Sequence, residues 1–172
     1  MHEDLPVHPA QLAEEHLLQQ CRIERGRGTG AGGQHRNKVE TFVRIIHLPT
    51  GVIGLAGERR SQQQNLSKAV FRLRLNLAMQ VRGYHEPGTS PSPLFQSRCR
   101  DGRIAVNPTH KDFPAILAEA IDIVVQKHYK VDKAAIVLGL TMSQLIKLIA
   151  KEPAALAMVN QERKKKKMRP LK

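Results

Sequence analysis

The sequence predicts an α+β fold, in which a small β-sheet with a packed helix is followed by an all-α segment and a basic tail. Residues 41–48 are rich in β-branched side chains that alternate between two faces, with Val43 and Ile45 on the same face. Turn residues at 49–51 separate them from a returning strand at 52–56, which predicts a hairpin. From Ser61 onward, apolar residues recur every three or four positions, which is the period of a helix.

Local signals predict the elements around the hairpin. Apolar spacing over 8–20 predicts a short opening helix, and 21–24 is extended in character, as in an edge strand. Ser61 followed by Gln64 is a capping box, which starts the next helix. That helix should bury five apolar residues and expose three basic ones, namely Leu66, Ala69, Val70, Leu73 and Leu77, and Lys68, Arg72 and Arg74.

Composition divides the chain into four regions. We expect a first domain over 1–85, a linker over 86–111, a helical segment over 112–161 and a basic tail over 162–172. The linker could hold a second hairpin that turns at Asp101-Gly102. Within the helical segment the expected helices cover 113–130, 132–138 and 142–151, and a last one begins after Pro153.

Three residues of the helical segment have a spacing typical of a helix-turn-helix. Ala135, Gly139 and Leu145 supply a small residue, a turn glycine and a buried apolar residue in that order. An ordinary helical hairpin is the other interpretation. In the nucleic-acid interpretation three side chains face outward, namely Ser143, Gln144 and Lys147.

Charge favours an acidic partner, and nucleic acid above others. The 172 residues hold 28 Lys and Arg against 15 Asp and Glu, a net charge of +13. Aromatic residues make up only 3%, so contact with phosphates is expected rather than stacking on bases. The tail is either a solvated end or an arm that binds RNA, and we expect it to stay solvated until it meets phosphate. Its candidate RNA-binding residues are Lys164, Lys165, Lys166, Lys167 and Arg169.

The sequence favours neither a membrane nor a metal. No apolar run approaches the roughly 18 residues that a membrane span needs. The first four residues include Glu3 and Asp4 where a signal peptide would have basic residues, so a cytoplasmic location is expected. Cys21 and Cys99 are too few for a disulfide framework or a zinc site of their own. We therefore expect no cofactor and no metal.

Residues 26–34 form the most distinctive segment, because five of the nine are glycine. Such a segment is a loop rather than a helix or strand. It lacks the Gly-Lys-Ser/Thr ending of a phosphate-binding P-loop, and it fits a dinucleotide fingerprint poorly. Two interpretations remain, namely a structural glycine loop and an exposed basic loop that presents Gln34 at its tip.

The sequence from 30 to 38, GAGGQHRNK, resembles the catalytic domain of class I peptide chain release factors. The residues at 43–51 and at 58–62 with Asn65 continue this similarity, which covers roughly 20–81. The resemblance implies an α+β domain with a small mixed or antiparallel sheet. It also implies hydrolysis of the peptidyl-tRNA ester in the peptidyl transferase centre of the large ribosomal subunit, with ribosomal RNA and peptidyl-tRNA as partners.

That reaction transfers an acyl group from a ribose oxygen to water. A catalyst must place the water and stabilise the developing negative charge. The backbone N–H of Gln34 can donate to that charge only through an uncommon turn, which Gly32 and Gly33 permit. The resemblance implies that the Gln34 side chain lines the water site, and its amide nitrogen is commonly methylated in the family.

Basic residues around the loop are candidates for RNA contact. Arg27, Arg36 and Lys38 would steer the loop into an RNA tunnel, although simple solvation also explains them. His35 could act as a general base, but we expect it to support the loop instead. The matching stretch after the hairpin adds two further candidates, Arg59 and Arg60.

The chain also departs from classical release factors, which carry a separate domain that reads stop codons. Its short build and basic tail are similar to codon-independent rescue factors, in which the tail probes the empty messenger channel. The helical segment between the catalytic domain and the tail departs from those relatives as well. The competing hypothesis is a non-catalytic ribosome- or nucleic-acid-binding adaptor with a helix-turn-helix-like module, and ester hydrolysis would separate the two.

Overall fold

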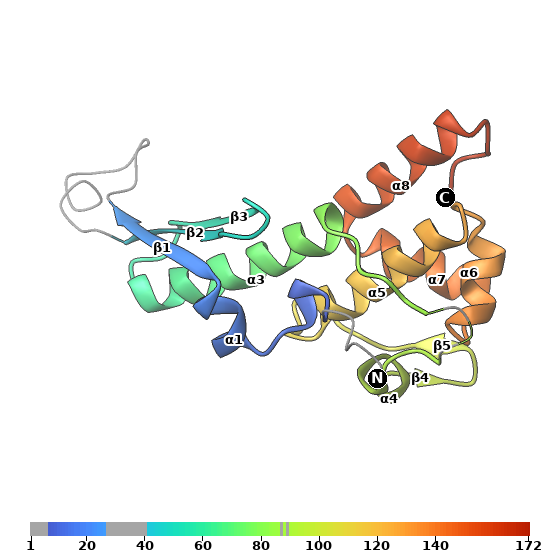
Figure 1. Cartoon of the computed structure of the whole chain (residues 1–172), viewed down its shortest axis with the longest axis horizontal. Helices are drawn as coiled ribbons and strands as arrows, with labels where there is room; N and C mark the ends of the chain where they lie inside the picture. Colours follow the sequence, from blue (N-terminus) through green and yellow to red (C-terminus); the bar gives the residue numbers. More distant parts are fainter. Residues whose placement is uncertain (1–6, 27–40, 87, 89) are drawn as a thin grey trace.

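The computed structural model describes residues 7–26, 41–86, 88 and 90–172. Its elements give an α+β fold with a small antiparallel sheet and a packed helix, as the sequence predicts (Figure 1). The sheet contains β1 (Cys21–Gly26), β2 (Phe42–His47) and β3 (Ile53–Ala56), in that order. The helices and remaining short strands are η1 (Pro9–Gln11), α1 (Glu14–Gln19), α3 (Gln62–Gln80), α4 (Pro93–Ser97), β4 (Cys99–Arg100), β5 (Arg103–Ile104), α5 (Phe113–Gln126), α6 (Val131–Val137), α7 (Met142–Ala150) and α8 (Pro153–Lys165).

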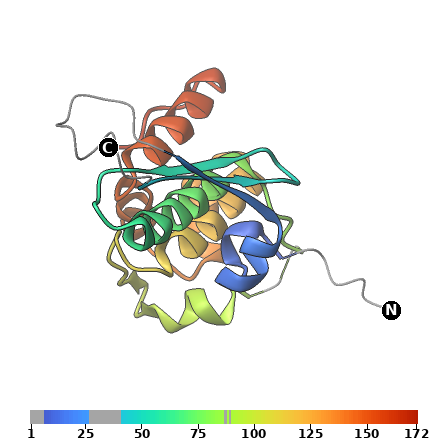
Figure 2. The same ribbon diagram turned by 90° about the vertical axis from the view of Figure 1, so that its left-hand side faces the viewer.

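The sheet buries one face against α3, which lies beneath the three strands in Figure 2. Val43 and Ile45 are fully buried on this face, so the predicted alternation of the strand is confirmed. β2 pairs antiparallel with both neighbours, and the predicted hairpin between β2 and β3 is present. The predicted edge strand is also present as β1.

Helix α3 begins as predicted, because the Ser61 hydroxyl accepts a hydrogen bond from the Gln64 backbone N–H at 3.3 Å. Four of the five predicted apolar residues are buried, while Leu66 is half-buried. Arg74 was expected to be exposed, and that expectation is wrong. Its guanidinium is partly buried and donates to the Leu12 carbonyl, because the N-terminal segment crosses this face of α3.

The single helix expected over 8–20 is interrupted, which corrects that prediction. η1 and α1 are separated by Leu12 and Ala13, whose backbones are extended. The 3-10 turn before the break is capped by His8. His8 is buried, and its Nδ1 accepts from the Ala10 N–H at 3.0 Å while its Nε2 lies 3.2 Å from the Val81 carbonyl.

The structure has two apolar cores, which meet where α3 packs against α5. One lies between the sheet and α3, and the other lies among α5, α6, α7 and α8. The outer side of α3, through Phe71, Leu75 and Met79, packs against the second core. The division of the chain at 85 and 111 stays a prediction.

Two buried carboxylates on α5 fix the segment that follows α3. Asp122 accepts from the Arg82 guanidinium and from the Gly83 N–H, both at 3.0 Å. Glu119 accepts from the Ser92 N–H at 2.7 Å and from its hydroxyl at 2.5 Å. Several hydrogen-bond donors thereby compensate the buried charge of each carboxylate. These bonds hold Arg82, Gly83 and Ser92 against α5.

The helical segment contains the predicted turns. Asp101 and Gly102 have φ of 50° and 71°, as a tight hairpin turn requires, and β4 pairs with β5. Gly139 has φ of 63°, and the axes of α6 and α7 differ in direction by 99°. That angle lies within the range of helix-turn-helix motifs. Of the three side chains expected to face outward, Ser143 and Lys147 are exposed and Gln144 is half-buried.

Among the described residues, no single helix is long and apolar enough to cross a membrane. By length and composition, α6 and α7 would reach that criterion only as a bent pair.

Two helix ends differ from the predictions. Helix α5 ends at Gln126 rather than continuing to 130, because His128 and Tyr129 both have left-handed backbones, with φ of 53° and 64°. Helix α8 extends through Lys165, so half of the region predicted to be a solvated tail is helical or forms the helix end. The residues after it fold back on α8 rather than projecting away from it.

Candidate functional site

The predicted catalytic residues lie outside the described residues. This holds for Gly32, Gly33 and Gln34, and also for four predicted RNA-binding residues, namely Arg27, His35, Arg36 and Lys38. The structure describes the elements that hold the two ends of their segment, namely β1, β2, β3 and α3. We call these elements the frame. Gly26, the last residue of β1, pairs directly with Phe42, the first residue of β2. The chain therefore leaves the sheet and returns to it at neighbouring positions.

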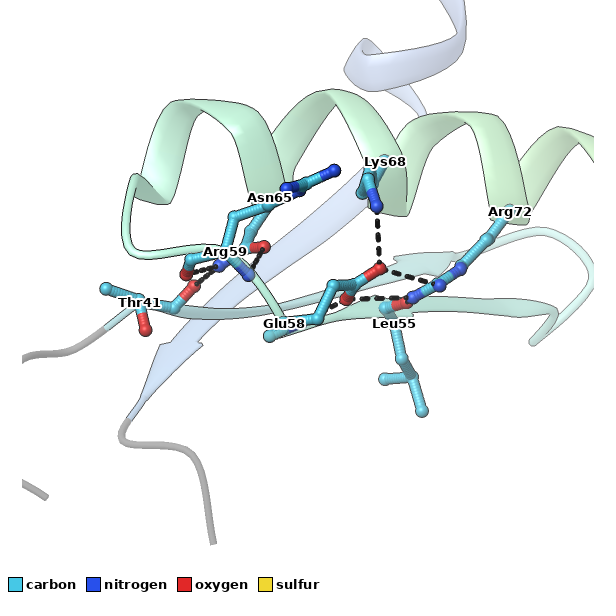
Figure 3. A network of polar contacts seen from close by, with 8 residues as sticks. Thr41, Leu55, Glu58, Arg59, Asn65, Lys68 and Arg72 are labelled. Carbon is cyan, nitrogen blue, oxygen red and sulfur yellow. Dashed lines mark hydrogen bonds and ion pairs between the residues drawn. The ribbon is translucent and has the colours of Figure 1, made fainter. Parts of the chain in front are cut away.

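A buried asparagine ties the returning end of this segment to the rest of the domain (Figure 3). Asn65 is fully buried on α3, and its Nδ2 donates to the Thr41 carbonyl at 2.6 Å and to the Arg59 carbonyl at 2.8 Å. Its Oδ1 accepts from the Arg59 N–H at 3.0 Å. One amide side chain thus connects three backbone groups, from the residue before β2 to the segment after β3.

An acidic residue beside this connection neutralises two cations of α3 (Figure 3). Glu58 accepts from Lys68 at 3.1 Å and from Arg72 at 2.7 Å. Backbone N–H groups, its own and that of Gly57, together with these two cations, lower the pKa of Glu58 to about 2. The carboxylate is therefore ionised at neutral pH, and it fixes the chain just before Arg59 and Arg60.

Side chains of α3 also close the outer edge of the sheet. Arg72 Nη1 donates to the Leu55 carbonyl at 2.8 Å, and Asn76 Nδ2 donates to the Ile53 carbonyl at 2.7 Å. β3 is an edge strand of the three-stranded sheet, so these carbonyls would otherwise be open to another strand. The frame is thereby protected from edge-to-edge pairing.

The predicted RNA-binding residues that the structure describes form two groups. Arg59 and Arg60 are exposed at the end of the sheet where β1 ends and β2 begins. The tail lysines and Arg169 are exposed around the end of α8, on the far side of the molecule (Figure 1). The structure therefore does not bring the two groups together. Within the described ranges, no three His, Cys, Asp or Glu side chains are placed to hold a metal ion.

Asn65 belongs to the motif that carries the resemblance, but the motif alone indicates no specific role for it. A signal was present in its spacing. Asn65 precedes Ala69 and Leu73 by four and eight positions, so a polar residue stands on the apolar face of α3. A buried amide in such a position needs hydrogen-bond partners, and the connection to Thr41 and Arg59 supplies them.

Comparison with known proteins shows what the part of the chain that contains this frame is similar to. Residues 15–91 match the model of the RF-1 domain family. Over 61 residues the chain is 52% identical to peptide chain release factor 1 of Acidiphilium cryptum, covering 36% of this chain and 17% of that protein. It is 43% identical over 74 residues to the factor 1 of Xylella fastidiosa, covering 43% and 18%, and 51% identical over 57 residues to that of Symbiobacterium thermophilum, covering 33% and 16%.

The residues that match are the residues that build the frame. They include all three strands of the sheet and the whole of α3. Residues 15–91 are therefore similar to the RF-1 domain, and over part of the chain the sequence is similar to peptide chain release factors. The chain spans less than a fifth of the length of the curated relatives it matches.

Removing the Asn65 amide should weaken the frame. Asn65→Ala leaves the Thr41 carbonyl and both backbone groups of Arg59 without their side-chain partner, so we expect a loss of about 2 kcal/mol in the free energy of unfolding. Asn76→Ala, on the same helix, removes one hydrogen bond from a half-buried residue and should cost less than half as much. Urea unfolding of both variants measures the difference. Equal losses would contradict the role given to Asn65.

Proposed function

We propose that this protein hydrolyses the ester bond between a nascent peptide and its tRNA on the ribosome. The observation that carries the proposal is the Gly32-Gly33-Gln34 sequence inside a segment that matches the RF-1 domain. The named relatives over this segment are peptide chain release factors. Gln34 would act at the peptidyl transferase centre, with ribosomal RNA around it.

The frame suits a catalyst whose active residues lie between two paired strands. Neighbouring attachment points on β1 and β2, together with the Asn65 connection, hold both ends of the segment that contains them. Arg59 and Arg60 place positive charge at the same end of the sheet. Charge at the base of the segment favours entry into a site surrounded by RNA phosphates.

We further propose that release is independent of a stop codon, as in rescue of stalled ribosomes. The residues after the RF-1 domain fold into helices that pack on α3 and end in a basic surface. Contact of such a surface with RNA phosphates depends on charge and shape, not on codon sequence. The non-catalytic adaptor is not favoured by the comparisons, which match release factors across the frame.

The test is peptide release from ribosomes that carry labelled peptidyl-tRNA and a sense codon, a stop codon or no codon in the A site. Purified protein should release peptide in all three cases, and fastest when the messenger is truncated. Buffer alone gives the background rate. Release only with the stop codon would contradict codon independence. Release at the background rate in all three cases would contradict hydrolysis itself.

A further inference from the structure

The basic residues at the C-terminus belong to a folded element, which we call the C-terminal hook and define as residues 160–172. Asn160 on α8 closes it by bonding twice to Leu171. Its Nδ2 donates to the Leu171 carbonyl at 3.1 Å, and its Oδ1 accepts from the Leu171 N–H at 2.7 Å. The Leu171 side chain packs against the core of the helical segment. A fully solvated tail with no fixed conformation would make none of these contacts.

The hook turns at the end of α8 through a well-defined helix stop. The Met168 N–H donates to the Arg163 carbonyl at 2.9 Å, and the Lys167 N–H donates to the Lys164 carbonyl at 3.0 Å. These two bonds are those of a Schellman motif, in which the residue at the Lys167 position is left-handed. Lys167 has φ of 57°, a conformation that costs a residue with a side chain about 1–2 kcal/mol relative to glycine. Lysine at this position places a cation at the turn, which glycine would not do.

Arg163 joins the hook to the corner between α5 and α6. Its Nε donates to the Arg169 carbonyl at 2.9 Å, and its Nη1 donates to the Tyr129 carbonyl. Lys166 Nζ lies 5.8 Å from the centre of the Tyr129 ring, within the range of a cation–π contact. The hook and this corner, residues 128–130, therefore form one surface.

This surface is strongly cationic. Six basic side chains of the hook are exposed, and the corner adds the exposed Lys130. Glu162 is the one acid of the hook, and it pairs with Lys165 at 2.5 Å. In the described part of the chain the other five exposed cations form no ion pair, namely Lys164, Lys166, Lys167, Arg169 and Lys172.

We propose that the C-terminal hook and the adjoining corner are a preformed binding surface for the phosphates of double-stranded RNA. Charge complementarity identifies phosphate as the ligand. Proteins that bind single strands stack bases on aromatic rings, but the one aromatic ring of this surface, Tyr129, is half-buried and lies near Lys166. The backbone that carries these cations is folded, which suits a duplex, because the phosphates of a duplex also lie at fixed spacings. The proposal rests on the proposed function, which supplies ribosomal RNA as the natural source of such a duplex.

The proposal gives the C-terminus a different action from that of an arm in the messenger channel. An extended arm would first have to break both bonds between Asn160 and Leu171 and withdraw Leu171 from the core. The hook instead binds as it is, without the loss of conformational entropy that ordering a flexible tail entails.

Two variants separate the shape of the hook from its charge. Asn160→Ala opens the hook and leaves every cation in place. Lys167→Gly removes one cation and keeps the turn, because glycine favours the left-handed backbone. Lys111→Gln, an exposed position just before α5, is the control for loss of one charge elsewhere. Amide exchange of the Leu171 N–H reports whether the hook is closed in each full-length variant.

The measurement is the affinity for a labelled 20-base-pair RNA duplex and a 20-nucleotide uridine strand over a range of salt concentrations. Asn160→Ala should bind the duplex about tenfold more weakly and lose its preference over the single strand. Lys167→Gly should lower the slope of log affinity against log salt by about one. Lys111→Gln should leave both quantities near the wild-type values.

Three results would overturn the proposal. Wild-type affinity of Asn160→Ala would mean that the charges act from a flexible arm. A Leu171 N–H that exchanges freely in the wild type would mean that no hook exists. Equal binding by all variants would mean that the surface serves another partner, such as an acidic protein. Because Gln34 takes no part in duplex binding, a protein that binds the duplex and fails to release peptide would contradict only the proposed function.

Discussion

Gln34→Ala should lower the rate of peptide release on the ribosome by about 100-fold or more, because a misplaced water alone can cost that much. In the proposed reaction the Gln34 side chain lines the site of the attacking water, and its backbone N–H donates to the developing negative charge. Alanine keeps the N–H but removes the side chain. Gly33→Ala should also lower release strongly, since a side chain at this position opposes the uncommon backbone turn. Neither variant should change the midpoint of thermal unfolding.

Single-turnover release from a ribosome with labelled peptidyl-tRNA measures this prediction. Gln63→Ala is a matched control, because Gln63 is an exposed glutamine in the first turn of α3, on the same domain. Its rate should equal that of the wild type. Unchanged release by both Gln34→Ala and Gly33→Ala would refute the catalytic role of the loop.

The parts of the fold that follow local rules were predictable from the sequence. The β2–β3 hairpin follows from strand alternation and turn residues, and the start of α3 follows from the Ser61 capping box. The turns at Gly102 and Gly139 follow from the freedom of glycine to adopt positive φ. In each case the chemistry that decides the structure lies within a few residues along the chain.

The errors fall where distant residues decide the structure. The opening segment begins with a 3-10 turn whose cap, His8, is buried next to Val81, 73 positions away. Arg74 is partly buried because Leu12 accepts its hydrogen bond. The hook closes through Asn160 and Leu171, 11 positions apart, and charge composition carries no information about that pairing. Composition therefore predicted the charge of the C-terminus but not its conformation.

For the candidate site, too, some features were predictable from the sequence and others depend on contacts between distant residues. The glycine-rich motif and its resemblance predict which residues would carry the chemistry. The frame depends on contacts across the fold, such as the Asn65 amide that connects Thr41 to Arg59. Only the structure shows that β1, β2 and α3 meet at the attachment points of the segment that holds the proposed catalytic residues.

Gly54→Ala should be the most damaging single substitution in this frame. Gly54 is buried on β3 opposite Ile45, and β3 lies so close to α3 that no side chain fits between them. A Cβ at this position would lie 2.6 Å from the Leu73 backbone nitrogen and would also overlap the Ala69 carbonyl oxygen. Both neighbours are backbone atoms of a helix, so neither can rotate away. The strand must separate from the helix instead, at a cost of about 3 kcal/mol.

The separation should also affect the proposed function, because β3 positions β2 and β2 carries one attachment point of the segment that holds the proposed catalytic residues. We expect the free energy of unfolding in urea to fall by about 3 kcal/mol, and peptide release to fall even at temperatures where the variant stays folded. Gly26→Ala is the matched control: a Cβ there meets no atom of the described residues within 4 Å, although Gly26 lies at the attachment point itself. Its stability should stay within about 0.5 kcal/mol of the wild type. If Gly54→Ala is as stable as Gly26→Ala, the strand and helix can separate freely, and the close packing of β3 on α3 does not hold the catalytic segment in place.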